Sequence, residues 1–240
     1  MRVVLGPEQG TEHPLTATTA QAVAVFRELG FSVANGPEVE TEFYNFDALN
    51  IPADHPARDM WDTFWVKGTA ADGSRRLLRT HTSPVQVRHM LEHGAPIKIV
   101  APGKVYRHEA TDTTHEAQFH QIEGLWIGED VSLADLKGVL EAFFKKFFGP
   151  EAEIRFRPSY FPFVEPGVEI DVKFGGKWLE VMGAGMVHAS VLEACKVDPK
   201  KYRGFAFGGG LDRFLMIKRG ITDVRDVYRP DLRFLARFMS

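Results

Sequence analysis

The chain has 240 residues, 44% of them hydrophobic, which is enough for one sizeable core, and we expect a single globular domain. A formal net charge of -3 excludes the overall basic field that drives non-specific nucleic-acid binding. Any nucleic acid must therefore bind through a local group of residues. The single cysteine, Cys195, excludes an internal disulfide framework and fits a reducing compartment. Because we find neither an 18-residue apolar run nor a signal-peptide pattern, we expect a cytoplasmic protein without a membrane segment.

The N-terminal part of the chain predicts a helix followed by a strand. We expect residues 1–12 to form a loose tail and residues 13–240 to form one domain. The apolar residues that follow helical spacing after Thr16 are Ala22, Val25, Phe26 and Leu29, and Gly30 is a suitable stop. The run FSVA then predicts a strand, which ends at the break Gly36-Pro37.

Two further helices have recognisable start signals. Ser83 is predicted to cap a helix that has Pro84 in its first turn. Ser132, with Asp135 three residues later, predicts the start of another helix, which ends at Gly149. Between the first two helices, the segment GTAADGSRR is short enough to connect the two strands of a hairpin.

Strand-like runs dominate the rest of the chain. They cover residues 97–101, 104–109, 117–128, 153–158, 168–174, 177–183 and 205–209. Few of these runs alternate with helices, and successive strands joined by short turns favour antiparallel pairing. We therefore predict an α+β fold, with an antiparallel sheet of six or seven strands flanked by helices.

The stretch RHEATDTTHEAQFHQIEG gathers charged and aromatic residues that suit a polar ligand. If it forms a hairpin, the two-residue period places Arg107 and Glu109 on one face. Phe119, Gln121 and Glu123 likewise share a face of the second strand. An arginine fork, an aromatic ring and carboxylates suit a ligand with a phosphate, a flat ring and an ammonium group. The alternative is that these residues form the solvated face of a hairpin.

A metal site in this stretch is less well supported. His108, His115 and His120 lack the spacing of a helical zinc site, and no cysteine accompanies them. Mg²⁺ bound through carboxylates beside a nucleotide fits better, because Mg²⁺ prefers oxygen ligands and phosphates.

A second candidate stretch is RTHTSPVQVR. His81 and Ser83 lie on one side of an extended segment just before a helix, where free backbone N–H groups favour an anion. The alternative is that Ser83 serves only as a helix cap.

A third candidate is SYFPFVEPG. Pro162 holds the backbone extended, so Phe161, Phe163 and Glu165 are predicted to project the same way, and the two rings could grip a third. Alternatively, the phenylalanines belong to the core.

The last candidate is FAFGGGLDR. The glycines 208–210 permit a tight turn from a strand into a helix that carries Arg213 in its first turn. On its own this short pattern is not specific.

Taken together and in this order, these stretches resemble a known family. The break at Gly36-Pro37, the Arg107 and Glu109 hairpin, and GGGLDR resemble motifs 1, 2 and 3 of class II aminoacyl-tRNA synthetases. More closely, the chain from about His13 to Phe238 is similar to the catalytic core of phenylalanyl-tRNA synthetase alpha chains. The stretches that carry this resemblance are GPEVETEFYNFDALNIPADHPARDMWDTFW, RTHTSP, THEAQFHQIEG, YFPFVEPG, GAGMVH and FAFGGGLDR.

The resemblance implies that ATP and Mg²⁺ are bound. Arg107 would hold the α-phosphate of ATP and the carboxylate of the amino acid, and Arg213 would hold the terminal phosphates. Phe119 would stack on adenine, with Glu109 near its amino group and His115 near the phosphates. Catalysis would then rest on positioning and charge neutralisation by Arg107, Arg213 and Mg²⁺.

The resemblance also implies that phenylalanine is the amino acid. The residues that would surround its ammonium and carboxylate groups are Trp61, His81, Ser83, Gln121 and Glu123. Phe161 and Phe163 would clamp its ring, and Ala206 would form the far wall of the pocket. Glu165 corresponds to a residue that is associated with magnesium in the family.

The acceptor and the partners stay open. Bacterial alpha chains carry a long N-terminal helical arm connected with tRNA binding, whereas only about a dozen residues precede the matched segment here. We expect a synthetase core that charges tRNA alone or with a beta chain, and a dimer formed through the N-terminal helix and the strand around Pro37. The alternatives are a stand-alone paralogue that serves a non-tRNA acceptor and a catalytically silent regulatory paralogue.

Overall fold

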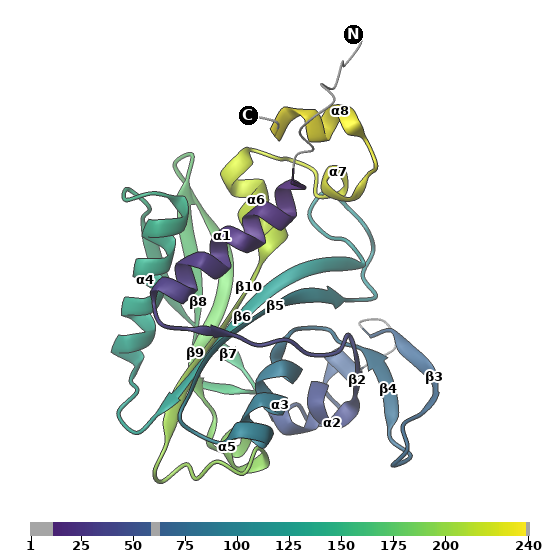
Figure 1. Cartoon of the computed structure of the whole chain (residues 1–240), viewed down its shortest axis with the longest axis vertical. Coiled ribbons are helices and arrows are strands. Elements are labelled where there is room, and N and C mark those ends of the chain that lie inside the picture. Colours follow the sequence, from purple (N-terminus) through teal and green to yellow (C-terminus); the bar gives the residue numbers. More distant parts are fainter. Residues whose placement is uncertain (1–11, 59–62, 239–240) are drawn as a thin grey trace.

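A computed structural model of the chain describes residues 12–58 and 63–238, so residues 1–11 of the predicted tail 1–12 lie outside the described residues. Its centre is a seven-stranded sheet with the order β1-β5-β6-β10-β9-β8-β7 (Figure 1). The strands are β1 Ser32–Val33, β5 Ile97–Tyr106, β6 Gln118–Gly128, β7 Ile154–Phe161, β8 Val164–Phe174, β9 Lys177–Val187 and β10 Arg203–Gly210. All neighbours pair antiparallel except β1 and β5, which are parallel. The predicted α+β class is confirmed.

Three helices cover one face of this sheet. They are α1 Pro14–Glu28, α4 Leu133–Phe148 and α6 Leu211–Arg219. Their apolar sides form an aromatic core in which the rings of Phe26 and Phe143 stack at 4.3 Å between centroids. The predicted start of α4 is confirmed, because Ser132 and Asp135 cap each other's backbone N–H groups.

The opposite face carries three other helices and the candidate site. These are α2 Glu42–Asn45, α3 Ser83–His93 and α5 Ala189–Ala194, with 3-10 turns at Asp47–Leu49 and Pro56–Arg58. The strand residues alternate between the two cores: Val100 points to the aromatic side, and Ile99 and Ala101 point to this side. Cys195 is fully buried here, and burial raises the pKa of its thiol to about 12, so the thiol stays protonated and packs within the core.

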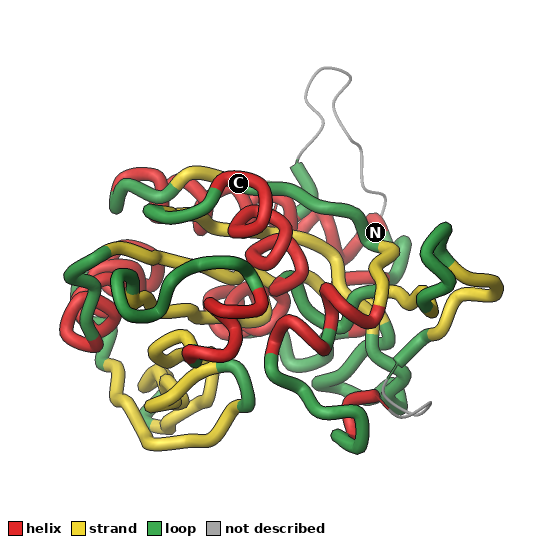
Figure 2. The backbone as a smooth tube through the Cα atoms, turned by 90° about the horizontal axis from the view of Figure 1, so that it is seen from below, coloured by secondary structure: helices red, strands yellow, loops and turns green. Residues whose placement is uncertain are grey.

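A small second sheet is formed by β2 Val39–Thr41, β4 Arg75–Leu78 and β3 Trp65–Thr69, in the order β2-β4-β3. The predicted hairpin connection is confirmed: Ala70 donates its backbone N–H to the Ser74 carbonyl at 2.9 Å. The β3–β4 hairpin projects from the edge of the molecule (Figure 2). Pro37 itself lies between β1 and β2, not in a strand.

The C-terminal segment folds back beside the start of α1. It contains α7 Arg225–Tyr228, α8 Leu232–Leu235 and a 3-10 turn at Ala236–Phe238. His13, the N-cap of α1, hydrogen-bonds through Nε2 to the Val227 carbonyl at 3.1 Å. Within residues 12–58 and 63–238, no helix is long and apolar enough to cross a membrane.

The structure corrects three local predictions. The runs at 97–101 and 104–109 are one strand, β5, which ends at Tyr106, so Arg107 and Glu109 lie in the loop before β6. Pro162 and Phe163 form the turn between β7 and β8, so this stretch is not one extended segment. Proline favours that turn as readily as an extended backbone, and local sequence does not separate the two.

Candidate active site

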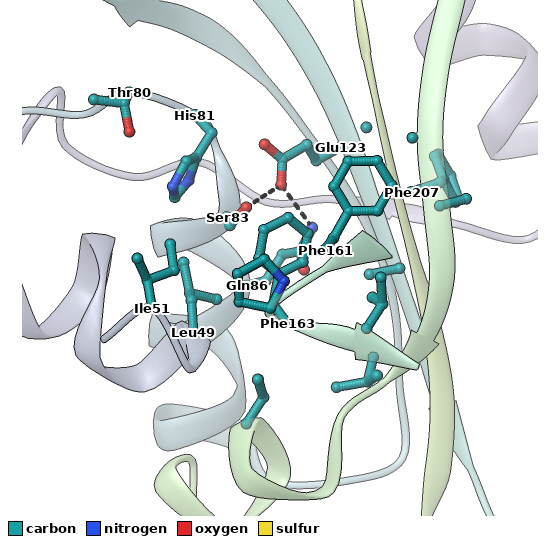
Figure 3. Close-up of a pocket in the computed structure, with 18 of the residues that line it drawn as sticks. Leu49, Ile51, Thr80, His81, Ser83, Gln86, Glu123, Phe161, Phe163 and Phe207 are labelled. Atoms are coloured by element: carbon teal, nitrogen blue, oxygen red, sulfur yellow. Dashed lines mark hydrogen bonds between the residues drawn. The ribbon is translucent and has the colours of Figure 1, made fainter. Parts of the chain in front are cut away.

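A cavity of about 610 Å³ opens on the face of the large sheet that carries α3 (Figure 3). Nine of the residues singled out in the sequence line it: His81, Ser83, Arg107, Glu109, Gln121, Glu123, Phe161, Phe163 and Ala206. They come from the start of α3, the β5–β6 loop, β6, the β7–β8 turn and β10. Segments far apart in the sequence thus meet at one hollow, as expected for a small-molecule site.

Glu123 forms the polar end of the cavity. Its side chain is buried and accepts hydrogen bonds from the Thr82 backbone N–H at 2.8 Å, the Ser83 hydroxyl and the Gln86 carboxamide at 3.1 Å. Burial raises the pKa of Glu123, and the hydrogen bonds from Ser83 and Thr82 oppose that rise. All three donors are neutral, so they orient the carboxylate without supplying a counter-charge. Such a group is suited to receive a cation from a ligand.

The predicted anion site at the start of α3 is occupied by this protein carboxylate. The Thr82 N–H, at the N-terminus of the helix, binds Glu123. Ser83 is the first residue of the helix, the N-cap is Thr82, and no side chain caps it. The prediction that Ser83 caps the helix is therefore wrong, because its hydroxyl is used by a residue 40 positions away.

Two half-buried side chains in the cavity wall, His81 and Gln121, have buried polar atoms that lack a hydrogen-bond partner within the described residues. Burial, with the nearby charge of Arg107, lowers the pKa of His81 to about 3, so its imidazole is neutral at physiological pH. Among the described residues, neither His81 ring nitrogen has a well-formed hydrogen bond, although the Asn45 backbone lies close enough to affect its pKa. The Gln121 side-chain oxygen also has no partner in the described chain. Unpaired buried groups in a cavity wall indicate that a ligand completes them.

Arg107 lies between the cavity and Phe119. Its Nε donates to the Thr80 carbonyl at 3.2 Å, and its guanidinium carbon lies 5.1 Å from the centroid of the Phe119 ring. Its Nη1 is 3.9 Å from a Glu109 carboxylate oxygen, and both side chains are about one-third exposed. Arg107 thus presents unused N–H donors at the open side of the cavity, next to an aromatic face.

The other residues expected to bind the nucleotide lie beyond the cavity wall. Arg213 stands in the first turn of α6, directly after the glycine end of β10, where Gly210 pairs with Gln121 of β6. Phe119 lies two residues before Gln121, at the same end of the sheet. His115 is exposed in the β5–β6 loop, where its Nδ1 lies 3.0 Å from an Asp112 oxygen.

The apolar end of the cavity is built around two phenylalanines. Phe161 and Phe163 flank the β7–β8 turn, with ring centroids 5.9 Å apart and planes inclined by 23°. Gly183 of β9 leaves room for Phe161, because a Cβ there would lie 2.9 Å from the Phe161 Cζ. Ala206 of β10 forms part of the wall with its small side chain. This end of the cavity suits an apolar ring.

Two predicted residues are placed elsewhere or lie outside the description. Glu165 is on β8 with its side chain 79% exposed, 3.7 Å from the His188 ring, and does not line the cavity with Phe161 and Phe163. The expectation that these three project together is therefore wrong, because the turn intervenes. Trp61 lies outside the described residues. Within residues 12–58 and 63–238, no group of three or more His, Cys, Asp or Glu side chains could hold a metal.

Sequence reasoning missed several residues of the wall. Gln86 binds Glu123 from α3, one turn after Ser83, and the spacing S-x-x-Q on one helical face was a usable signal. Gly208 was singled out as one of three glycines before a helix, but its position opposite Glu123 in the β6–β10 register was not predicted. The apolar contributors from distant segments are Leu49, Ile51, Met90, Leu125, Val187 and Val191. The local sequence gives no signal for these residues, because an apolar residue of the cavity wall has the same sequence pattern as an apolar residue of the core.

The architecture agrees with comparisons to known proteins. A solved structure of pyrrolysyl-tRNA synthetase from Desulfitobacterium hafniense superposes with a TM-score of 0.69 over 90% of this chain and 74% of that chain. At 21% sequence identity, this likeness shows the fold: an antiparallel class II synthetase core. The family model "tRNA synthetases class II core domain (F)" matches residues 4–238. The chain belongs to this class II tRNA synthetase family.

Curated relatives narrow the resemblance. The chain is 56% identical over 230 residues to the phenylalanine–tRNA ligase alpha subunit of Synechocystis sp., covering 96% of this chain and 68% of the relative. It is 54% identical to the phenylalanine–tRNA ligase alpha subunit of Laribacter hongkongensis, covering 97% and 69%. The alpha subunit of Jannaschia sp. is 53% identical, covering 95% and 67%. The chain therefore spans about two-thirds of the length of these relatives.

Proposed function

We propose that this chain is the catalytic core of a phenylalanine–tRNA ligase. It activates phenylalanine with ATP to phenylalanyl-adenylate and transfers the phenylalanyl group to tRNA. The observation that carries this proposal is the cavity itself, which has a buried carboxylate, Glu123, at one end and two phenylalanine rings at the other. Relatives of more than 50% identity with that name support it.

The ammonium group and the ring of the amino acid bind at opposite ends of the cavity. Its ammonium group pairs with Glu123, whose three neutral donors leave the negative charge for the ligand. Gln121 and His81 supply the unpaired polar atoms around the ammonium and carboxylate groups, and Ser83 acts by holding Glu123. The ring lies against Phe161, Phe163 and Ala206. A tyrosine hydroxyl in that apolar wall would be buried without a partner, which costs about 1–3 kcal/mol.

ATP occupies the open side of the cavity and the adjoining glycine-rich end of the sheet. Arg107 contacts the α-phosphate and the attacking carboxylate, and Phe119, stacked beside it, receives the adenine ring. Glu109 and His115 flank the base and the phosphates, and Arg213 binds the terminal phosphates. The amino acid carboxylate, already ionised at pH 7, attacks the α-phosphorus and pyrophosphate leaves. The chain contributes positioning and positive charge, and needs no protein nucleophile.

In this proposal, Mg²⁺ binds together with ATP. Glu165 is a single exposed carboxylate, and the described residues offer no preformed cage of three ligands. A metal that binds mainly to phosphate oxygens and keeps several waters fits this arrangement. We therefore treat Mg²⁺ as part of the bound Mg-ATP, with Glu165 as at most one protein ligand.

The proposal includes a partner subunit and tRNA. The relatives are named alpha subunits, which supports a heteromer with a second kind of chain. The alternative assembly is a homodimer that forms through α1 and the segment around Pro37. Because aminoacyl-tRNA is consumed by protein synthesis, the proposal places the chain in the cytoplasm.

Pyrophosphate exchange with each of the twenty amino acids tests the first step. We expect exchange that depends on phenylalanine and is at least tenfold weaker with tyrosine, in line with the cost of the unpaired hydroxyl. Adding tRNA, with and without a partner chain, then tests the second step through acid-stable charging. Exchange without charging would favour a non-tRNA acceptor, and the absence of exchange with every amino acid would favour a silent regulatory paralogue.

A further inference from the structure

A buried carboxylate behind the nucleotide-binding residues links three separate segments. Asp212, in the first turn of α6, is only 5% exposed. One of its oxygens accepts a hydrogen bond from the His120 backbone N–H at 2.6 Å, and the other accepts one from the Tyr228 hydroxyl. Asp212 thereby joins α6 to strand β6 and to α7.

The residues next to Asp212 and His120 in the sequence are ones that are proposed to bind the substrates. Asp212 directly precedes Arg213 in the same helical turn, and His120 lies between Phe119 and Gln121 on β6. The hydrogen bond from His120 therefore fixes the helix turn of Arg213 against the strand that carries Phe119. Neither Asp212 nor the two groups that it joins need to touch the substrate for this effect.

Tyr228 strengthens the link from the C-terminal side. Its hydroxyl lies 3.1 Å from Nδ1 of His120, and the two rings are nearly parallel, inclined by 14° with centroids 6.3 Å apart. Burial, together with the negative charge of Asp212, raises the pKa of the Tyr228 hydroxyl. The hydroxyl therefore stays protonated and remains a donor at every pH at which the protein works.

The same short segment also holds the β5–β6 loop. Val224, just before α7, donates its backbone N–H to the Thr113 carbonyl at 2.9 Å. Thr113 belongs to the loop that carries Glu109 and His115, and Figure 1 shows α7 beside this loop. Residues 224–228 thus contact both the loop and the helix that are proposed to surround ATP.

We propose that Asp212 and Tyr228 are positioning residues for the nucleotide half of the site, which hold Arg213 at a fixed place relative to Phe119. This inference rests on the proposed function, because it assigns the group being positioned to the binding of ATP. Loss of the link lets the first turn of α6 shift against β6. Binding of ATP then weakens, whereas Glu123 stays bonded to the start of α3 and the two phenylalanines stay at the β7–β8 turn, so binding of phenylalanine is retained.

The test compares Tyr228→Phe and Asp212→Asn with the wild type in phenylalanine-dependent pyrophosphate exchange. Tyr228→Phe keeps the ring and removes one donor, and we expect the KM for ATP to rise about tenfold. Asp212→Asn leaves one acceptor oxygen for two donors, so we expect a larger rise. The KM for phenylalanine should stay within about twofold in both. Tyr202→Phe, on the far side of the molecule before β10, is the matched control and should leave both constants unchanged.

Each outcome distinguishes this inference from the function on which it rests. A wild-type protein that shows no exchange, either alone or with its partner subunit, overturns the proposed function. A normal wild type combined with an unchanged KM for ATP in Tyr228→Phe overturns the positioning role alone. Equal rises in both Michaelis constants would also overturn it, because they would show a general loss of structure. Thermal unfolding of each variant identifies such a loss, and Tyr228→Phe decides the question if Asp212→Asn does not fold.

Discussion

Glu123 and Gly208 face each other across strands β6 and β10, so closely that a Cβ on Gly208 would lie 2.8 Å from the Glu123 Cγ. That separation is shorter than carbon atoms tolerate, and the backbone on both sides is held in the sheet. The glycine is therefore what allows the carboxylate to lie flat against the strand and reach the N-terminus of α3. The glycine-rich strand therefore borders the proposed amino-acid site as well as the proposed nucleotide site.

Gly208→Ala should accordingly weaken phenylalanine binding. The added methyl displaces Glu123 from its donors at Thr82 and Ser83, and we expect the KM for phenylalanine in pyrophosphate exchange to rise about tenfold or more. Gly138→Ala is the matched control, since nothing lies within 4 Å of its added Cβ on α4. The control should leave exchange unchanged and stabilise the fold by about 0.5–1 kcal/mol. Equal KM values in both variants would contradict the role assigned to Gly208.

Ser83→Ala should change the pH dependence of phenylalanine binding. The Ser83 hydroxyl lowers the pKa of Glu123, which burial raises, so its removal raises that pKa further. As pH falls, Glu123 is protonated and loses its attraction for the ammonium group. The rise in the KM for phenylalanine on acidification should therefore begin at a higher pH in the variant. Ser159→Ala, which removes a similar bond to Glu169 outside the cavity, should leave the profile unchanged.

Arg107→Ala should nearly abolish exchange. The variant removes the guanidinium that is proposed to neutralise charge at the α-phosphate, and the loss of such a donor reduces the rate by about 100-fold or more. Cys195→Ala, at a buried and inert thiol, should leave the exchange rate at the wild-type level. An Arg107 variant with full activity would remove this residue from the site.

Substitutions of Ala206 should alter which rings are accepted. A bulkier side chain narrows the apolar end of the cavity and should raise the KM for phenylalanine, whereas Ala206→Gly should admit para-substituted rings. Competition between phenylalanine and its para-substituted analogues in exchange measures both effects. If the selectivity were the same in all three proteins, Ala206 would not belong to the ring pocket.

Asp212 should make stability depend on pH in an unusual direction. Burial raises its pKa from 3.8 to about 6, so the folded chain binds the proton more tightly than the unfolded chain. Its contribution to stability is fully present below about pH 4 and is lost as pH rises through about 6. Asp212→Asn removes this contribution. The difference in unfolding free energy between the variant and the wild type, measured by denaturant titration, should therefore change most between these two pH values.

Where local chemistry decides a structure, the sequence was a good guide. The capping pair Ser132 and Asp135 identified the start of α4, and the turn residues at 70–74 identified the β3–β4 hairpin. The order of the motifs was enough to indicate the class II fold. The cap, the turn and each single motif depend on residues within a few positions of one another.

Where the deciding contact is distant, local reasoning failed. Ser83 has the residue type and position of a helix cap, yet its hydroxyl bonds to Glu123. Phe161 and Phe163 meet the cavity from two sides of a turn, not from one face of a strand. The link between Asp212 and Tyr228 joins residues 16 positions apart in two helices, and nothing in the local sequence distinguishes these two residues from polar residues that are exposed to solvent.

The alternation of side chains along β6 sets a fixed spacing for the reaction. Phe119, Gln121 and Glu123 follow one another at steps of two residues, and each step of an antiparallel strand advances about 6.8 Å. The distance between the proposed adenine surface and the proposed ammonium site is therefore a property of the backbone, which side-chain substitutions do not adjust. A β-amino acid has one extra carbon between its ammonium and carboxylate groups. With its ammonium group held at the same distance from the adenine surface, its carboxylate would lie in the wrong place for attack.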